Sequence, residues 1–193
     1  GGARVVGAGS GFVDHGGVFC RFGTASTPSS VVPALLRSEA ELVCVSANVS
    51  ACGAVRLALT LNGDRAAFIE SNASFEYYDP KSLRVSGVLP VAGPAAGGSL
   101  LSVSGAGFAL LGPVRCNLGW PTQTVNATVV NSSLVLCATP FISGPEWLGG
   151  QLMPGGQREP LEVSLNGQDY SSSHVMFLGY NQSEVHVDEL IPA

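Results

Sequence analysis

Residues 97–108, GGSLLSVSGAGF, repeat residues 1–12, GGARVVGAGSGF, without a gap. Further segments of the chain match one another in the same order, while the spacing between the copies drifts by only a few residues. These pairs are 18–23 with 114–119, 43–44 with 136–137, 59–63 with 163–167, and 75–78 with 177–180. A repeat at a spacing of about 100 residues predicts two copies of one small domain whose strands are kept while the loops vary.

The repeated segments are typical of short β-strands separated by turns. In residues 57–61, LALTL, leucines alternate with small or polar residues. This pattern predicts a strand with one buried and one solvent-exposed face. Asn62-Gly63 follows, Asn166-Gly167 recurs in the second copy, and this dipeptide predicts a tight hairpin. Gly105 and its counterpart Gly9 predict a bend or bulge where a side chain would collide. Because 25 glycines and 12 prolines supply many turns, the composition favours all-β architecture.

The repeat also predicts the domain organisation. We expect one domain in residues 1–82, whose first strand is missing, and a second in residues 83–183. A short linker at residues 79–82 would join them. Residues 187–192 match residues 85–90, so residues 184–193 are expected to start a third domain. Each unit of roughly 100 residues with about seven short strands predicts an immunoglobulin-like β-sandwich, here in a tandem array cut from a longer one.

The motifs of the repeat occur in a characteristic order. They are PVAGPAAGG at 90–98, GAGF at 105–108, VRCNLG at 114–119, LVLC at 134–137, SLNG at 164–167 and FLGY at 177–180. In this combination the chain resembles the IPT/TIG domain, which occurs in plexins, scatter-factor receptors, fibrocystin-like surface proteins and Rel-type transcription factors. The resemblance covers nearly the whole chain. It implies a tandem of immunoglobulin-like sandwiches that bind or space other proteins and carry no catalytic site.

The repeat gives Cys20 and Cys44 the same positions as Cys116 and Cys137. We expect one disulfide within each copy, and two buried thiols per copy are the alternative. Closing a loop of this size would stabilise each domain by roughly 3 kcal/mol on the chain-entropy model. Cys52 has no counterpart in the second copy. In a secreted protein such a leftover cysteine forms a bond outside the segment or remains a free thiol.

The pattern Asn-x-Ser/Thr occurs five times, where this composition predicts about one match by chance. The five asparagines are Asn48, Asn72, Asn126, Asn131 and Asn181. Together these sequons favour the secretory pathway, with N-linked glycans and an extracellular or cell-surface location. A serine-rich chain with fortuitous matches is the alternative. The net charge of −5 and the single lysine disfavour nucleic-acid binding, and no apolar run is long enough for membrane insertion.

No group of residues in the chain predicts catalysis, a cofactor site or a metal site. His15, His174 and His186 lie in different parts of the repeat, and no nucleophile is fixed beside any of them. The cysteines lack the Cys-x-x-Cys spacing of a zinc site. The glycine-rich stretch at residues 7–11 leads to a cysteine-containing strand, which is not the helix that a phosphate-binding loop requires. We therefore predict that this segment is not an enzyme.

Two aromatic loops are candidates for partner contact. Residues 141–156 form the least symmetric part of the repeat and carry Trp147 and Leu148 where a loop is expected. Trp120, in Gly119-Trp120-Pro121, is the second candidate. Exposed aromatic side chains often dominate the energetics of protein interfaces. The alternative is that both loops fold back over the edge of the sandwich.

These observations predict a structural or adhesive array that acts as a spacer and as a contact surface for other proteins or for copies of itself. It would belong to a surface filament or a matrix glycoprotein. A ligand-binding receptor ectodomain and an accessory domain of an extracellular enzyme are the alternatives. The DNA-binding use of the same fold is disfavoured by the acidic balance and by the paired cysteines.

Overall fold

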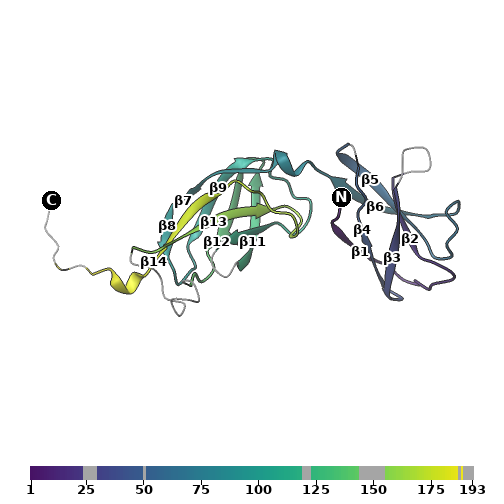
Figure 1. Cartoon of the computed structure of the whole chain (residues 1–193), viewed down its shortest axis with the longest axis horizontal. Coiled ribbons are helices and arrows are strands. Elements are labelled where there is room, and N and C mark those ends of the chain that lie inside the picture. The colour runs from purple at the N-terminus through teal and green to yellow at the C-terminus, as the bar shows by residue number, and fades with distance from the viewer. Residues whose placement is uncertain (24–29, 50, 119–122, 144–154, 187, 189–193) are drawn as a thin grey trace. The chain divides into compact units, whose positions relative to one another are not determined.

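The computed structural model describes all residues except 24–29, 50, 119–122, 144–154, 187 and 189–193. Strands make up nearly all of the regular structure, as the repeat predicted. The chain divides into two compact units, Gly1–Asp79 and Pro80–Ala193, called unit 1 and unit 2 below (Figure 1). Within the expected linker at 79–82, Pro80–Ser82 form a one-turn 3-10 helix, η1, that belongs to unit 2.

Unit 1 is a sandwich of six strands within its described residues. Their order across the sheet is β1-β4-β3-β2-β5-β6. The strands are β1 (Arg4–Ala8), β2 (Phe19–Phe22), β3 (Ser30–Ser38), β4 (Glu41–Val45), β5 (Gly53–Thr60) and β6 (Ile69–Tyr77).

Strand β3 belongs to both layers of this sandwich. Its first half pairs with β2 as far as Pro33, and its second half pairs with β4 from Ala34 onward. The chain therefore passes from the β3-β2-β5-β6 layer to the β1-β4-β3 layer within one strand. The core lies between the layers, where Phe22 and Leu57 of one pack with Leu42 of the other.

Unit 2 contains eight strands within its described residues, in the order β7-β9-β12-β11-β10-β13-β14-β8. A second 3-10 helix, η3 (Gln182–Glu184), follows the last strand. The strands are β7 (Arg84–Leu89), β8 (Ala92–Pro94), β9 (Leu100–Ala106), β10 (Arg115–Leu118), β11 (Gln123–Asn131), β12 (Leu134–Ala138), β13 (Gln157–Ser164) and β14 (Val175–Tyr180).

Strand β11 repeats the crossing that β3 makes in unit 1. It pairs with β10 as far as Asn126 and with β12 from Ala127. These residues correspond to Pro33 and Ala34 at one constant spacing, since 126 − 33 and 127 − 34 both equal 93. The two units thus share the register of their central strands as well as their sequence motifs.

Two strands of unit 2 have no counterpart in the described part of unit 1. β7 pairs antiparallel with β9, and β8 pairs parallel with β14. In unit 1 the equivalent strands β1 and β6 lie at the two ends of the strand order. Within the described residues, β1 and β6 are therefore the edge strands of unit 1.

Gly9 and Gly105, the glycines paired by the repeat, each lie against a buried phenylalanine ring. A β-carbon at Gly9 would lie 2.5 Å from the ring of Phe12, and one at Gly105 would lie 2.5 Å from the ring of Phe108. Phe12 and Phe108 are both buried. The glycines are therefore required by close packing, as the sequence predicted.

The prediction of tight hairpins at the two Asn-Gly dipeptides is wrong. In unit 1 the pairing of β5 with β6 ends at Leu59 opposite Ile69, so a longer loop separates the strands. Asn62 instead accepts hydrogen bonds from the Thr60 hydroxyl at 2.8 Å and from the backbone N–H of Asp64 at 3.1 Å. The Asn62 side chain accepts hydrogen bonds that a backbone carbonyl would accept in a regular turn, so Asn62-Gly63 forms the first turn of a longer loop.

Asn166 does the same in unit 2. Its side-chain oxygen accepts from the Ser164 hydroxyl at 3.1 Å and from the backbone N–H of Gln168 at 2.9 Å. The glycine after each asparagine has a positive φ, 74° at Gly63 and 72° at Gly167. The sequence thus located the turn correctly and misjudged its length.

Candidate functional site

Each unit contains one disulfide that joins its two layers. Cys20 on β2 is bonded to Cys44 on β4, and Cys116 on β10 is bonded to Cys137 on β12. These are the pairs that the repeat suggested, and in both the Cα atoms are 6.4 Å apart. All four cysteines are buried.

The disulfides bracket the strand that crosses between the layers. Cys20 lies opposite Val32 and Cys44 lies opposite Ala34, both on β3. In unit 2, Cys116 lies opposite Val125 and Cys137 opposite Ala127, both on β11. Each disulfide therefore holds the two layers together at the point where the chain passes between them, and it closes a loop in the unfolded chain.

Cys52 is exposed and unbonded in this structure, immediately before β5. It lies outside the disulfide framework, and the described residues place no second free cysteine beside it.

The outer face of the β1-β4-β3 layer carries an apolar row. Val6 lies opposite Val43, and Val43 lies opposite Leu35, so the three side chains cross three adjacent strands. Val6 is 53% exposed and Leu35 is 56% exposed, whereas Val43 between them is buried. We call Val6, Val43 and Leu35 the apolar row; Val45, 53% exposed, extends this face along β4.

The equivalent row of unit 2 is flanked by hydroxyls. Ser102 lies opposite Leu136, and Leu136 lies opposite Thr128. Thr128 also belongs to the sequon of Asn126, and both residues are exposed on β11. At the position of the row, unit 2 therefore carries two hydroxyls and a sequon in place of the two exposed apolar side chains of unit 1, although Leu100 on the same face of β9 is 65% exposed.

The sequon asparagines differ in their surroundings. Asn48, Asn72, Asn126 and Asn131 are exposed. Asn181 is only half-exposed, and its side chain caps η3: its oxygen accepts from the Ser183 backbone N–H at 3.1 Å, and its amide nitrogen donates to Glu184 at 3.0 Å. Glycosylation at Asn181 would replace one hydrogen of that amide nitrogen, beside its contact with Glu184.

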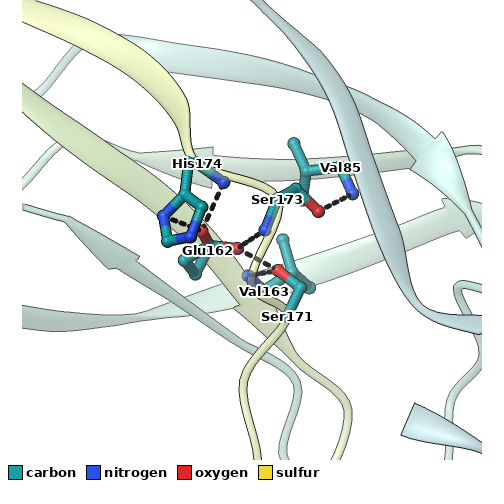
Figure 2. Close-up of polar contacts among 6 residues, drawn as sticks. All are labelled: Val85, Glu162, Val163, Ser171, Ser173 and His174. Carbon is teal, nitrogen blue, oxygen red and sulfur yellow. Dashed lines mark hydrogen bonds and ion pairs between the residues drawn. The ribbon is translucent and has the colours of Figure 1, made fainter. Parts of the chain in front are cut away.

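A half-buried carboxylate organises the loop between β13 and β14 in unit 2. Glu162 accepts hydrogen bonds from the Ser171 hydroxyl, from the Ser173 backbone N–H at 3.0 Å and from the His174 backbone N–H at 2.7 Å (Figure 2). The Ser173 hydroxyl in turn accepts from the backbone N–H of Val85 on β7 at 2.9 Å. Glu162 therefore connects β13, the loop and the first strand of the unit.

This cluster contains the residue types of a catalytic triad without its geometry. The Ser171 hydroxyl donates to the carboxylate, and it also accepts from the Val163 backbone N–H at 3.1 Å. His174 Nδ1 lies 3.8 Å from the same carboxylate, and the residue has a positive φ of 55°. In a catalytic triad the serine hydroxyl donates to the histidine. Here Ser171 and His174 both contact the Glu162 carboxylate instead. The cluster holds a loop in place.

Unit 1 covers the corresponding outer face in a different way. Ala58 stands where unit 2 has Glu162, opposite Arg21 of β2. Arg21 pairs with Glu70, lies 4.5 Å from the centre of the Phe68 ring and is only 6% exposed. The prediction that this face of β5 is solvent-exposed is wrong, because Ala58 lies between Arg21 and Glu70 on the neighbouring strands and both Ala58 and Thr60 are buried.

The histidines and acidic residues do not form a metal site within the described part of the chain. Asp14 accepts hydrogen bonds from the backbone N–H groups of Gly16 and Gly17, at 2.9 and 2.7 Å, and these bonds lower the pKa of its carboxyl. His15 follows it in the same turn. The Asp14 carboxylate therefore caps the backbone N–H groups of the residues that follow it.

Glu159 on β13 points into the core beside Phe177, and burial raises the pKa of its carboxyl.

The predicted contact residues Trp120, Trp147 and Leu148 lie outside the described residues. No helix in the described part of the chain is long and apolar enough to span a membrane.

The matched frame of strands, glycines and cysteines agrees with a comparison against protein families. A family profile described as "IPT/TIG domain" matches residues 83–177. Unit 2 is an IPT/TIG domain. The IPT/TIG resemblance and the immunoglobulin-like β-sandwich class predicted from the sequence are therefore confirmed. A comparison with curated protein sequences found no match.

Two solved structures of the plexin A4 extracellular region are similar to this chain over most of its length. One, described as domains 1 to 10, has a TM-score of 0.57 and 15% sequence identity over 86% of this chain. The other, with domains 1 to 8, has a TM-score of 0.52 and 15% identity over 93% of this chain. This chain covers only 13% and 16% of those structures. At this identity the likeness concerns the fold.

Sequence reasoning missed the apolar row and the Glu162 cluster. The row leaves a signal when the copies are aligned, because Val6 and Leu35 replace Ser102 and Thr128 on outward-facing positions. The cluster leaves none, because Ser171 and Ser173 lie in a loop whose length differs between the copies.

Proposed function

We propose that this chain is part of a non-catalytic extracellular array of tandem IPT/TIG domains, serving as a spacer and as a contact surface between proteins. The observation that carries the proposal is the pair of layer-bridging disulfides at equivalent positions, because disulfides persist mainly in secreted and surface proteins. Likeness to the extracellular region of plexin A4 and four exposed sequon asparagines support it.

The spacer role follows from the construction of the units. Each disulfide fixes the two layers at the crossing strand, so a pull along the chain meets a covalent connection between layers. The junction between units is short, with β6 ending at Tyr77 and η1 starting at Pro80. Disulfide-linked β-sandwich domains with short linkers suit a protein segment that holds other domains apart.

The contact surface that we propose is the apolar row of unit 1, and its occupant is the same row of a second copy. Flat apolar positions without a sequon can pack against one another, whereas a glycan at Asn126 would shield the equivalent face of unit 2. Arg4 and Glu41 lie at opposite ends of this face on β1 and β4. Two copies related by a two-fold axis would bring opposite charges together at both ends.

The experiment displays the chain on suspension cells and measures their aggregation. The double substitution Pro33→Asn with Leu35→Thr places the Asn-x-Thr sequon of Asn126 at the equivalent position of unit 1. We expect the added glycan to abolish aggregation, while Asn126→Gln, which removes the natural glycan, leaves it intact. Leu35→Thr alone should leave unit 1 folded, because this side chain is 56% exposed. Equal aggregation by all variants would refute the contact surface.

The compartment is tested separately by non-reducing peptide mapping of the protein from its natural source, before and after glycan removal. Linked Cys20–Cys44 and Cys116–Cys137 peptides with glycans on several asparagines are the expected result. Free thiols and bare asparagines would place the protein inside the cell and overturn the extracellular assignment.

A further inference from the structure

Unit 2 carries an apolar patch on the outer face of its β7-β9-β12 layer. Leu89 on β7 is 66% exposed and Leu100 on β9 is 65% exposed, and no large apolar side chain on a described strand is more exposed. Leu100 lies opposite Ala138, an exposed residue of β12, and Leu136 is half-buried on the same face of that strand. We call these four residues the Leu100 patch. Apolar side chains gathered on one face call for an explanation of what covers them.

The sequon of Asn126 lies beside this patch. In the ladder between β11 and β12, Ala127 lies opposite Cys137, and Asn126 and Ala138 are the next residues along the two strands. Asn126 and the patch occupy outward-facing positions, since side chains alternate along a strand and Cys137 is buried in the core. β9 is two strands away from β11, which corresponds to about 10 Å at the usual strand spacing. The first sugars of an N-linked glycan on Asn126 can therefore reach Leu100.

Arg115 fixes the direction in which a sugar would leave Asn126. It lies opposite Asn126 on β10, and its guanidinium donates to the side-chain oxygen of Asn126. Because a guanidinium can only donate, this contact requires the oxygen and turns the amide nitrogen away from β10. β11 has β10 on one side and β12 on the other. A glycan on that nitrogen would therefore extend on the side of β12 and the Leu100 patch.

Unit 1 lacks both the sequon and the exposed leucine at the equivalent positions. The constant spacings of the repeat give Pro33 the position of Asn126, and Pro33 lies opposite Phe19, which has no donor to offer. They also give Arg4 the position of Leu100. The apolar side chain and the sequon are thus present together in unit 2 and replaced together in unit 1. This is the pattern expected if one of them covers the other.

We propose that the glycan of Asn126 packs on the Leu100 patch as a fixed cover of this face of unit 2, with Arg115 as the residue that positions it. The C–H faces of the sugar rings and the methyl group of N-acetylglucosamine would remove the leucines from water, while the sugar hydroxyls stay in solvent. The inference rests on the extracellular assignment proposed above, since N-linked glycans are added in the secretory pathway. It leaves the apolar row of unit 1 as the open face.

The first test measures how fast hydroxyl radicals label Leu100 in the chain secreted from eukaryotic cells. Thr128→Ala removes the sequon while keeping Asn126 itself, and we expect labelling of Leu100 to rise several-fold because the sugars no longer cover it. Met176, 40% exposed on β14 of the other layer, is the internal reference and should be labelled equally in both proteins.

The matched control is Ser133→Ala, which removes the sequon of Asn131 at the end of β11 and should leave labelling of Leu100 unchanged. Equal labelling of Leu100 in the parent and in Thr128→Ala, with Asn126 glycosylated in the parent by peptide mapping, would overturn the proposal. Protection of Leu100 that appears only at high protein concentration would assign the patch to a second copy and overturn it as well.

The second test addresses Arg115. Arg115→Met keeps an apolar stem of similar length and removes the donor. We expect Asn126 to remain glycosylated while labelling of Leu100 rises, because the amide is no longer held toward β10. Leu100 that stays protected in this variant, with β10 still folded by hydrogen exchange, would refute the positioning role of Arg115.

The third test asks whether the glycan and the patch act together on stability. Thr128→Ala should lower the melting temperature of unit 2 by about 4 °C when Leu100 is present. In a Leu100→Ser background the same substitution should lower it by much less, because the sugars have lost the side chain on which they pack. An equal shift in both backgrounds would show that the glycan stabilises unit 2 without the patch, and would overturn the proposal.

The outcome is separable from that of the proposed function. A bare Asn126 beside other glycosylated asparagines would overturn this inference alone, whereas bare asparagines throughout and free cysteines would overturn the extracellular assignment. The substitutions Pro33→Asn and Leu35→Thr, which test the apolar row, lie in unit 1 and should leave labelling of Leu100 unchanged.

Discussion

Unit 1 and unit 2 share one frame and differ in what covers it. Both cross between layers within one strand, and both place a disulfide at that crossing. Unit 2 adds β7 and β8, which bury Leu101 and Phe177 completely, whereas Val5 and Phe75 in unit 1 remain half-buried. The comparison teaches that the frame is set by inward-facing residues, because the same strand crossing and the same disulfide occur in both units although the burial of their edge residues differs.

The outer faces differ even more. Unit 2 holds its β13–β14 loop with Glu162, and unit 1 uses the Arg21–Glu70 pair beneath Phe68 at the same place. The apolar row of unit 1 corresponds to hydroxyls in unit 2. Outward-facing positions are free to change because no core depends on them. Differences in function between the units are therefore expected on these faces.

Removal of a disulfide should have the largest effect, and unit 1 should suffer more. Cys20→Ser with Cys44→Ser, and Cys116→Ser with Cys137→Ser, each cost about 3 kcal/mol of unfolding free energy by the chain-entropy estimate. Because Val5 and Phe75 of unit 1 are half-buried where Leu101 and Phe177 of unit 2 are fully buried, we expect the first pair of substitutions to unfold unit 1 of residues 1–193, while unit 2 survives its own. Hydrogen exchange read by mass spectrometry for each unit measures this. Equal loss of protection in the two units would break the comparison.

Glu162→Ala should have the next largest effect, and only on unit 2. The substitution leaves the N–H groups of Ser173 and His174 without their acceptor, and we expect unit 2 to lose about 2 kcal/mol. Ser172→Ala, on an exposed neighbour in the same loop, serves as the control. Urea denaturation measures both. A loss no greater than that of the control would show that the loop is held by other contacts.

Asn62→Ala should cost about 1 kcal/mol, and Asn166→Ala should cost more. Both asparagines accept from a hydroxyl two residues earlier and from a backbone N–H two residues later. Asn166 alone also accepts from the backbone N–H of Asp169 at 2.9 Å and donates to the Asp169 carboxylate at 2.8 Å. Asn72→Ala on the exposed side of β6 is the control. Equal costs in denaturation would show that the contacts of Asn166 with Asp169 add no stability.

Glu159→Gln should have the smallest effect, a gain in stability that depends on pH. Burial raises the pKa of Glu159 above its ordinary value of 4.5, so the folded state holds the proton more tightly than the unfolded state. This carboxyl therefore favours folding fully below about pH 4.5, and its contribution is lost as pH rises through the folded pKa. The glutamine variant should melt at a higher temperature than the parent at pH 7 and at nearly the same temperature at pH 4. An equal difference at both pH values would contradict the assignment.

Much of the frame could be read from the sequence because inward-facing residues repeat. The pairs Gly9–Gly105, Phe12–Phe108 and Cys20–Cys116 recur since each is required by close packing in the same core. The hairpin prediction failed for the opposite reason. Asn62 and Asn166 specify a local turn, but the number of residues before the next strand depends on what the rest of the loop contacts.

By itself the sequence determined the all-β class, the two copies, the IPT/TIG motifs and the cysteine partners, because these depend on residue types at fixed spacing. Only the tertiary structure decided which faces are covered. Glu162 contacts Ser171 and His174 through the fold of a loop, and Val6 and Leu35 lie on opposite sides of Val43 on the same face of the layer. Contacts between residues distant in the chain depend on strand order and register, which a local pattern does not encode.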